Sequence, residues 1–90
     1  MTTKTKILLC ENGINGESVS ATALKNNGFV VTTRQKNGNE AIEAIKDERP
    51  DIVIVDAEMQ GANAESVINR VKADMIVPPK FIVITSYGQI

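Results

Sequence analysis

The chain has 90 residues, the length of one domain, and a domain of this size buries only about 60% of its unfolded surface on folding. Ten Lys and Arg residues stand against 11 Asp and Glu residues, with no basic block, so we do not expect this segment to bind nucleic acid. No apolar stretch has the length of a signal peptide or the roughly 20 residues that span a bilayer. We therefore expect a cytoplasmic protein without a membrane partner.

The sequence contains no histidine, which excludes Ser-His and Cys-His nucleophiles and most zinc sites. The single cysteine, Cys10, ends an apolar run and is expected to be a buried hydrophobic residue rather than a redox group. Carboxylates, hydroxyls, amides and lysines remain for chemistry. Most of these are oxygen ligands, so any bound metal is expected to be a hard cation such as Mg²⁺.

The first predicted elements are a strand at residues 6–10 and a helix at residues 17–26, joined by a loop with two glycines. Val19, Ala23 and Leu24 fall on one face of the helix. Gly28 is placed to end it as the C′ residue.

The second strand and helix follow at residues 29–33 and 40–47. The strand is more polar at its far end, which favours a position at the edge of the sheet. The turn Asn37–Asn39 supplies the N-cap of the helix, and Pro50 stops the chain from continuing it. The apolar stripe of this helix consists of Ala41, Ile42 and Ile45.

The run from Pro50 to Asp56 is the most informative segment, because a continuous apolar strand there carries the Asp56 carboxylate to its own C-terminal end. Open α/β sheets bind their ligands at that end of the strands. A loop at residues 57–63 follows this strand.

A third helix at residues 64–73 and a last strand at residues 81–84 complete the predicted elements. Asn63 is expected to cap the helix. Pro78 and Pro79 end the connection, and the apolar composition of the last strand predicts that it is buried. The inward face of the helix consists of Val67, Ile68 and Val71.

Strands and helices alternate along the chain, which predicts an α/β fold with four parallel strands and right-handed crossovers. The C-terminal ends of parallel strands share one edge, so Glu11, Asp56 and Thr85 are expected close together. Simpler interpretations stay open, because Asp56 can cap the next turn, Glu11 can be a solvated loop acid and Asn12 an ordinary turn residue. The glycines of the first loop are only a weak nucleotide-binding signal.

The order and spacing of several motifs resemble those of bacterial response-regulator receiver domains over nearly the whole chain. That family carries an acidic pair after its first strand, an NG-x-EA turn before its second helix, a phosphoacceptor Asp after its third strand and a Thr or Ser after its fourth. The matching segments are Leu8–Asn12, Asn37–Ala41, Pro50–Asp56 with Met59 following, and Ile82–Ser86. The ending at residues 84–89 most resembles the sporulation-initiation regulators called stage zero sporulation protein A.

The resemblance implies a flavodoxin-like (CheY-like) fold and a signalling domain rather than an enzyme. Asp56 would accept a phosphoryl group from a histidine kinase, a phosphotransfer protein or a small acyl phosphate in a two-component or phosphorelay pathway. Thr85 would be the switch hydroxyl. Mg²⁺ would be held by Glu11, Asn12, Asp56 and the backbone carbonyl of Glu58.

Several positions depart from the family pattern. Asn12 stands in place of the second acid, which keeps an oxygen ligand but removes a negative charge, so the affinity for Mg²⁺ should fall. Gln60 replaces the usual Pro, and Ala62–Ala64 stands where an Asp-Gly pair is common. A degenerate receiver that acts as a protein-interaction module without phosphorylation is therefore an alternative. A nucleotide- or flavin-binding fragment of similar topology is a third.

The family's domains are longer than this chain, so we expect a receiver domain truncated after its fourth strand. Such a domain would lack two further helices, a fifth strand and the lysine that ends this fifth strand. Lys80 lies at the wrong end of its own strand to replace that lysine. The apolar strand at residues 81–84 would then expose an unpaired edge. We expect the isolated chain either to hide this edge by forming a homodimer or to fold poorly.

Overall fold

The computed structural model describes residues 4–10, 19–34 and 37–84 and contains one four-stranded parallel sheet in the order β2-β1-β3-β4. The strands are β1 (Lys6–Cys10), β2 (Val30–Arg34), β3 (Ile52–Asp56) and β4 (Lys80–Ile84). The helices are α1 (Val19–Asn26), α2 (Gly38–Glu48) and α3 (Ala64–Asp74). The predicted alternation of strands and helices is confirmed, and so is the position of β2 at the edge of the sheet.

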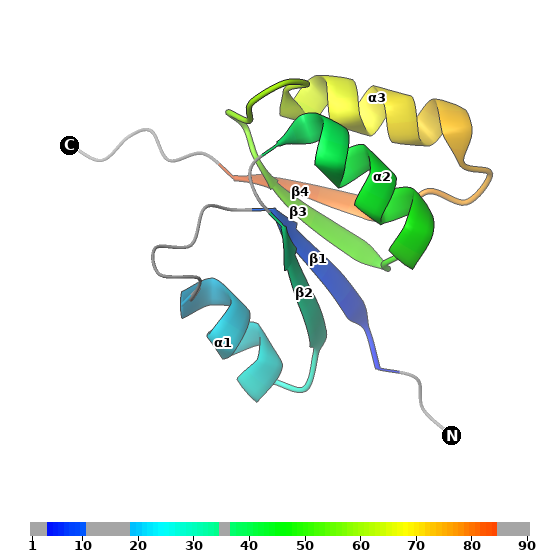
Figure 1. Cartoon of the computed structure of the whole chain (residues 1–90). Helices are drawn as coiled ribbons and strands as arrows, with labels where there is room; N and C mark the ends of the chain where they lie inside the picture. The colour runs from blue at the N-terminus through cyan, green and yellow to red at the C-terminus, as the bar shows by residue number, and fades with distance from the viewer. Residues whose placement is uncertain (1–3, 11–18, 35–36, 85–90) are drawn as a thin grey trace.

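The sheet lies between two layers of helix, with α2 and α3 on one face and α1 on the other (Figure 1). Side chains alternate between the faces of a strand, so each strand contributes to both layers. Beneath α2 and α3 the core contains Leu8, Cys10, Ala41, Ala44, Ile45, Val53, Val55, Ala64, Val67 and Val71. The smaller core beneath α1 contains Ile7, Leu9, Ala21 and Val31.

Helix α1 ends in a Schellman motif with Gly28 at C′, the position that the sequence predicted for this glycine. The amide of Gly28 donates to the carbonyl of Lys25 at 3.0 Å, and the amide of Phe29 donates to the carbonyl of Leu24 at 3.2 Å. Gly28 has φ of +91°, a conformation that costs glycine little. The predicted apolar face of this helix was wrong in part, because Ala21 is buried whereas Ala23 is exposed. Val19 begins α1, but its side chain lies outside the described part of the chain.

Helix α2 begins two residues earlier than predicted because its cap is Asn37. The Asn37 Oδ1 accepts hydrogen bonds from the amides of Asn39 and Glu40, at 3.0 and 3.1 Å. At the other end Arg49 adopts a left-handed conformation, and the chain leaves the helix before Pro50. Ala41 and Ile45 are buried as expected, Ile42 is half-buried, and Ala44 is an additional buried residue of this face.

Helix α3 begins where the sequence predicted. The Asn63 Oδ1 accepts from the Ser66 amide at 2.8 Å, which confirms the predicted cap. Val67 and Val71 are fully buried, while Ile68 is half-buried at the margin of the core. The chain then reaches β4 through residues 75–79.

The prediction that the last strand is buried was wrong. In β4 Ile82, Val83 and Ile84 are 47%, 49% and 40% exposed. The strand pairs with β3 only, and within the described residues nothing pairs with its outer edge. An apolar composition therefore did not correspond to burial, because burial depends on which elements flank the strand.

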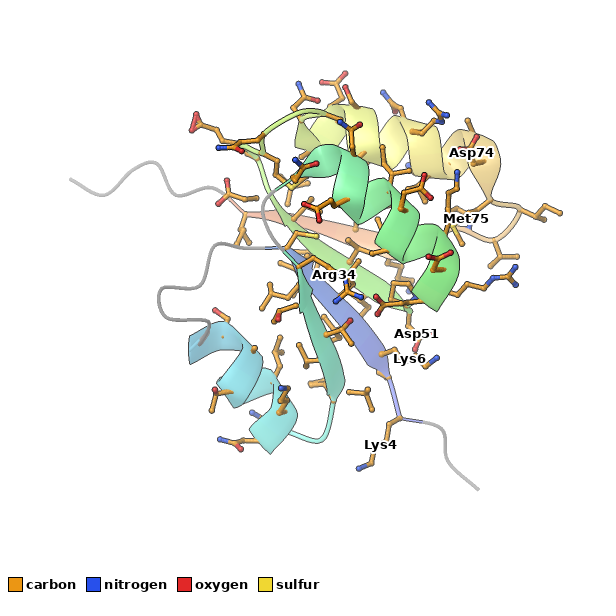
Figure 2. All side chains as sticks on the ribbon, viewed as in Figure 1. Lys4, Lys6, Arg34, Asp51, Asp74 and Met75 are labelled. Atoms are coloured by element: carbon orange, nitrogen blue, oxygen red, sulfur yellow. The ribbon has the colours of Figure 1, made fainter. Side chains whose placement is uncertain are left out.

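The amino ends of β1 and β3 are joined through Asp51 (Figure 2). The Lys6 amide donates to Asp51 Oδ2 at 2.8 Å, and the Asp51 amide donates to the Lys6 carbonyl at 2.9 Å. These bonds fix the register at the end of the sheet opposite Asp56. Among the helices that the structure describes, none is long and apolar enough to cross a membrane.

Candidate functional site

Strand β3 places Asp56 at the C-terminal edge of the sheet. The strand is central, between β1 and β4, and its Val53 and Val55 are fully buried against α2 and α3. This packing holds the strand rigidly, and Asp56 is its last residue. A carboxylate is thereby held at the edge where parallel sheets bind ligands.

Asp56 is 6% exposed, and it is the one buried charged residue among those that the structure describes. Its Oδ1 accepts a hydrogen bond from the amide of Glu58 at 2.9 Å. Next to it, the amide of Ala57 donates to the carbonyl of Ile84 at 2.7 Å. The carboxylate is therefore oriented by its own following turn, and that turn is tied to the end of β4.

The other predicted site residues follow the ends of neighbouring strands. Cys10 is paired with Val55, one residue before Asp56, and Ile84 is paired with Asp56 itself. Glu11 and Asn12 come directly after Cys10 in the sequence, and Thr85 directly after Ile84. These three residues lie outside the part of the chain that the structure describes.

The loop between β3 and α3 rests on the N-terminus of α2, a feature that the sequence did not predict. The amide of Gly38 donates to the carbonyl of Gln60 at 2.8 Å, and Asn37 and Gln60 form an isolated parallel β-bridge. The sequence predicted the Asn37-Gly38-Asn39 turn as a cap and as a match to the NG-x-EA turn of receiver domains, and nothing in it indicated this contact. Gln60, noted as a departure from the family pattern, is held through its backbone.

The described residues form no metal site by themselves. No three His, Cys, Asp or Glu side chains gather there in an arrangement that could hold a metal ion. Of the four predicted ligands, the structure describes Asp56, whose carboxylate is at the edge of the sheet, and Glu58, which is exposed. Both offer oxygen atoms, the donor type that Mg²⁺ prefers.

Cys10 is close to the site in sequence but belongs to the core beneath α2 and α3. Burial raises the pKa of its thiol from 9.0 to about 11, while Arg34 lowers it and Glu48 raises it further. The expectation of a buried hydrophobic residue is confirmed. A thiol with this pKa is protonated at neutral pH and is a poor nucleophile.

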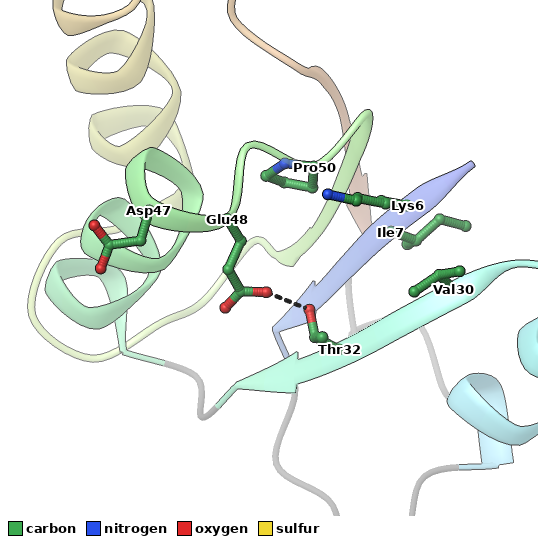
Figure 3. Close-up of a pocket in the computed structure, with 7 residues that line it drawn as sticks. All are labelled: Lys6, Ile7, Val30, Thr32, Asp47, Glu48 and Pro50. Carbon is green, nitrogen blue, oxygen red and sulfur yellow. Dashed lines mark hydrogen bonds between the residues drawn. The ribbon is translucent and has the colours of Figure 1, made fainter. Parts of the chain in front are cut away.

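A pocket of about 360 Å³ lies at the opposite end of the sheet, between the first residues of β1 and β2 and the end of α2 (Figure 3). Thr32 donates a hydrogen bond to Glu48 Oε1 at 2.8 Å across it, and Glu48 also pairs with Arg34. The polar groups at its centre thus satisfy one another. Because Lys6 and Val30 start their strands, this pocket is remote from Asp56 and is not part of the same site.

Residues 7–90 match the family described as the response regulator receiver domain. No curated protein matches the chain closely enough to count as a relative.

Solved structures similar to this chain include two described as receiver domains. A signal receiver domain of a modulated diguanylate cyclase from Desulfovibrio desulfuricans, described as an example of alternate folding, is 30% identical, with a TM-score of 0.74 over 94% of this chain and 67% of that one. The BeF₃-activated receiver domain of RstA from Klebsiella pneumoniae is 22% identical, with a TM-score of 0.76 over 94% and 70%. The N-terminal domain of an uncharacterized protein from Wolinella succinogenes is 25% identical, with a TM-score of 0.78 over 94% and 67%.

Proposed function

Because the chain belongs to the family of response regulator receiver domains, which act in two-component signalling, we propose that Asp56 is its phosphoacceptor. The observation that carries the proposal is the placement of one nearly buried carboxylate at the C-terminal end of the central strand, oriented by the Glu58 amide. Family membership favours this function over the phosphorylation-independent module. It also gives no support to a nucleotide- or flavin-binding fragment.

In the proposed reaction one carboxylate oxygen of Asp56 attacks the phosphorus atom of the donor. The new bond joins this oxygen to phosphorus while the bond from phosphorus to the donor breaks, and the donor keeps the bonding electrons. A phosphohistidine leaves as imidazole, and an acyl phosphate leaves as a carboxylate. Phosphoryl transfer depends on positioning and charge neutralisation rather than on covalent help from the protein. The hydrogen bond from Glu58 serves the first of these needs by fixing Oδ1.

Charge neutralisation would come from Mg²⁺, which family membership implies for the phosphorylation site. We propose that Glu11, Asn12, Asp56 and the backbone carbonyl of Glu58 hold the ion. Oxygen donors suit this hard cation, and the Asn12 amide supplies an oxygen without a charge. The affinity for Mg²⁺ should therefore rise when Asn12 is replaced by Asp, and an Asn12→Asp variant tests this assignment by titration.

Receiver domains interact with histidine kinases or phosphotransfer proteins, and we propose such a protein as the phosphoryl donor for this chain. We also propose a cytoplasmic location, because these kinases use ATP. Thr85 is proposed as the hydroxyl that responds to the phosphoryl group. The likeness of residues 84–89 to the sporulation-initiation regulators leads us to propose a phosphorelay protein as donor. Phosphoryl transfer from such a protein, measured beside transfer from an unrelated kinase, tests this finer assignment.

Beryllium fluoride binding tests the proposed site without a kinase, because BeF₃⁻ mimics a phosphoryl group on a carboxylate oxygen. With Mg²⁺ present, we expect the amide resonance of Glu58 to shift in a saturable way. Asp56→Asn should abolish the shift. Asp51→Asn, at the opposite end of the same strand, should retain it. No shift in the parent chain, or an equal shift in Asp56→Asn, would contradict the assignment.

We also propose that the isolated chain forms a homodimer through β4. Ile82, Val83 and Ile84 belong to an exposed apolar strand whose outer edge pairs with no strand among the described residues, and such edges pair with other strands. Sedimentation velocity should show a dimer whose fraction rises with concentration. Ile82→Lys should dissociate it, while Ile76→Lys, at a fully exposed position outside β4, should leave it intact. A monomer at every concentration would contradict the proposal.

A further inference from the structure

We propose that the N-terminus of α2 positions the loop that follows Asp56 and contains Glu58, so that residues 37–39 set the geometry of the candidate phosphoacceptor. We call the contact between residues 37–39 and residues 60–62 the clamp. The consequence for phosphoryl transfer rests on the proposed function, whereas the clamp itself does not.

The clamp is a close backbone contact. The Gly38 amide donates to the Gln60 carbonyl at 2.8 Å, and Asn37 bridges to Gln60. A Cβ atom added at Gly38 would lie 1.9 Å from the carbonyl oxygen of Ala62 and 2.7 Å from its Cβ. Gly38 is buried, and the helix and loop backbones therefore meet where no side chain fits.

The asparagines of the same turn extend the contact to Gly61. A Cβ atom added at Gly61 would lie 2.9 Å from Asn39 Nδ2 and 3.6 Å from Asn37 Oδ1. Asn37 Oδ1 is itself held by the amides of Asn39 and Glu40. One side chain thus caps the helix and borders the loop at once.

The loop is held at both ends and in the middle. Asp56 at its start belongs to the rigid central strand, and Asn63 at its end caps α3. Between them the clamp holds residues 60–62, only two residues beyond the Glu58 amide that orients the Asp56 carboxylate. A displacement at Ala62 would therefore be transmitted through a short tethered segment to Glu58.

Helix α2 is anchored in the core, which fixes the position of its N-terminus. Ala41 and Ile45 on its inner face are fully buried against β1 and β3. The first turn of α2 cannot follow a moving loop without disturbing this core. The loop must therefore adapt to the helix, which makes residues 37–39 positioning residues and not catalytic ones.

The test compares Gly38→Ala with Gly28→Ala in the full chain. Each variant adds one methyl group to a glycine. Gly38 is buried against the loop, whereas Gly28 lies at the end of α1 with φ of +91° and has nothing within 4 Å of an added Cβ. Gly28→Ala thus controls for a general loss of stability. Asn37→Ala, with Asn37→Asp as the rescue variant that restores an oxygen acceptor, covers the case in which Gly38→Ala does not fold.

The first readout is hydrogen exchange of the Glu58 amide, measured relative to the slowest amides of β1 and β3. We expect this ratio to rise about tenfold or more in Gly38→Ala and in Asn37→Ala, and to stay at the parent value in Gly28→Ala and Asn37→Asp. This readout needs no phosphorylation, so it tests the clamp even if the proposed function fails. An unchanged ratio in both Gly38→Ala and Asn37→Ala would overturn the inference.

The second readout is the rate at which Asp56 gains a phosphoryl group from an acyl phosphate with Mg²⁺. Since misplacement by about 1 Å can cost a reaction about 100-fold, we expect at least a tenfold lower rate in Gly38→Ala than in Gly28→Ala. Equal rates in these two variants would overturn the catalytic consequence of the clamp. A parent chain that gains no phosphoryl group would instead contradict the proposed function.

Discussion

Asp56 and Cys10 stand one residue apart in the register of neighbouring strands, yet their side chains have different surroundings. Cys10 points into the core beneath α2 and α3, where burial keeps its thiol protonated. Asp56 ends β3 at the edge of the sheet, where a backbone amide is available to its carboxylate. The alternation of side chains along a strand explains the difference.

The raised pKa of Cys10 predicts slow alkylation. With the pKa moved from 9.0 to about 11, the thiolate fraction at pH 8 falls about 100-fold, and burial slows access further. Iodoacetamide should therefore modify the native chain at least 100-fold more slowly than N-acetylcysteine. Rates are followed by mass spectrometry, and the urea-unfolded chain serves as control. Native modification as fast as that of N-acetylcysteine would contradict the placement of Cys10.

Residue-scale predictions succeeded where the signal was local. The cap at Asn63 and the C′ glycine at Gly28 act within one helical turn, so the sequence is sufficient to identify them. For α2 the sequence identified the capping turn at residues 37–39 but placed the start of the helix two residues too late. The inward face of α1 was missed at Ala21, because a short helix with few large apolar residues carries a weak periodic signal. The contact of Gly38 with Ala62 could not be predicted, since these residues are distant in sequence and meet through their backbones.

At the scale of elements, helix α2 is anchored by Ile45, which is fully buried. Ile45→Ala should lower the free energy of unfolding by about 2–5 kcal/mol, because it removes buried methyl groups and leaves a cavity. Ile76→Ala is the matched control, since Ile76 is fully exposed, and it should change that free energy by less than about 0.5 kcal/mol. Urea titration monitored by circular dichroism measures both. Equal effects of the two substitutions would contradict the described core.

Helices α2 and α3 are also joined by Asp74, labelled in Figure 2. Its Oδ2 accepts from Lys46 Nζ at 3.1 Å and from Arg70 Nε at 2.9 Å. The hydrogen bonds from Lys46 and Arg70 hold the pKa of the Asp74 carboxyl below its usual 3.8. A carboxyl with a lowered pKa in the folded state stabilises it at neutral pH, and this contribution is lost as the pH falls through the folded pKa.

Asp74→Asn should accordingly destabilise the chain at pH 7, and its difference from the parent should shrink as the pH falls from 4 toward 2. Asp47→Asn, at an exposed position in α2 for which the structure describes no ion pair, should show no such pH dependence. Urea unfolding at each pH supplies the measurement. A difference that stays constant down to pH 2 would show that the Asp74 pairs do not contribute.

The exposure of strand β4 could not be predicted from its own sequence. Its type and position follow from Phe81–Ile84, but its exposure does not, because exposure depends on the neighbours of the strand. Only β3 pairs with it among the described residues. The same apolar run would be buried in the middle of a sheet.

At the scale of the whole molecule, parallel topology gathers the strand ends at one edge, which is why the sequence was sufficient to place Asp56. Alternating strands and helices predicted a parallel sheet, and the order β2-β1-β3-β4 puts β3 in its interior. Glu11, Asn12 and Thr85 follow the ends of β1 and β4 in the sequence but lie outside the described residues, so their roles stay predictions.

The measurement that tests the central proposal most directly is the intact mass of the chain after incubation with acetyl phosphate and Mg²⁺. We predict a gain of one phosphoryl group that disappears in Asp56→Ala and persists in Asp51→Asn, a substitution just before the start of the same strand that keeps an oxygen acceptor for the Lys6 amide. Hydroxylamine, which attacks the acyl carbon of an acyl phosphate and releases phosphate, should replace the phosphoryl group by a hydroxamate. No gain in the folded parent chain, or an equal gain in Asp56→Ala, would contradict the assignment of Asp56 as the phosphoacceptor.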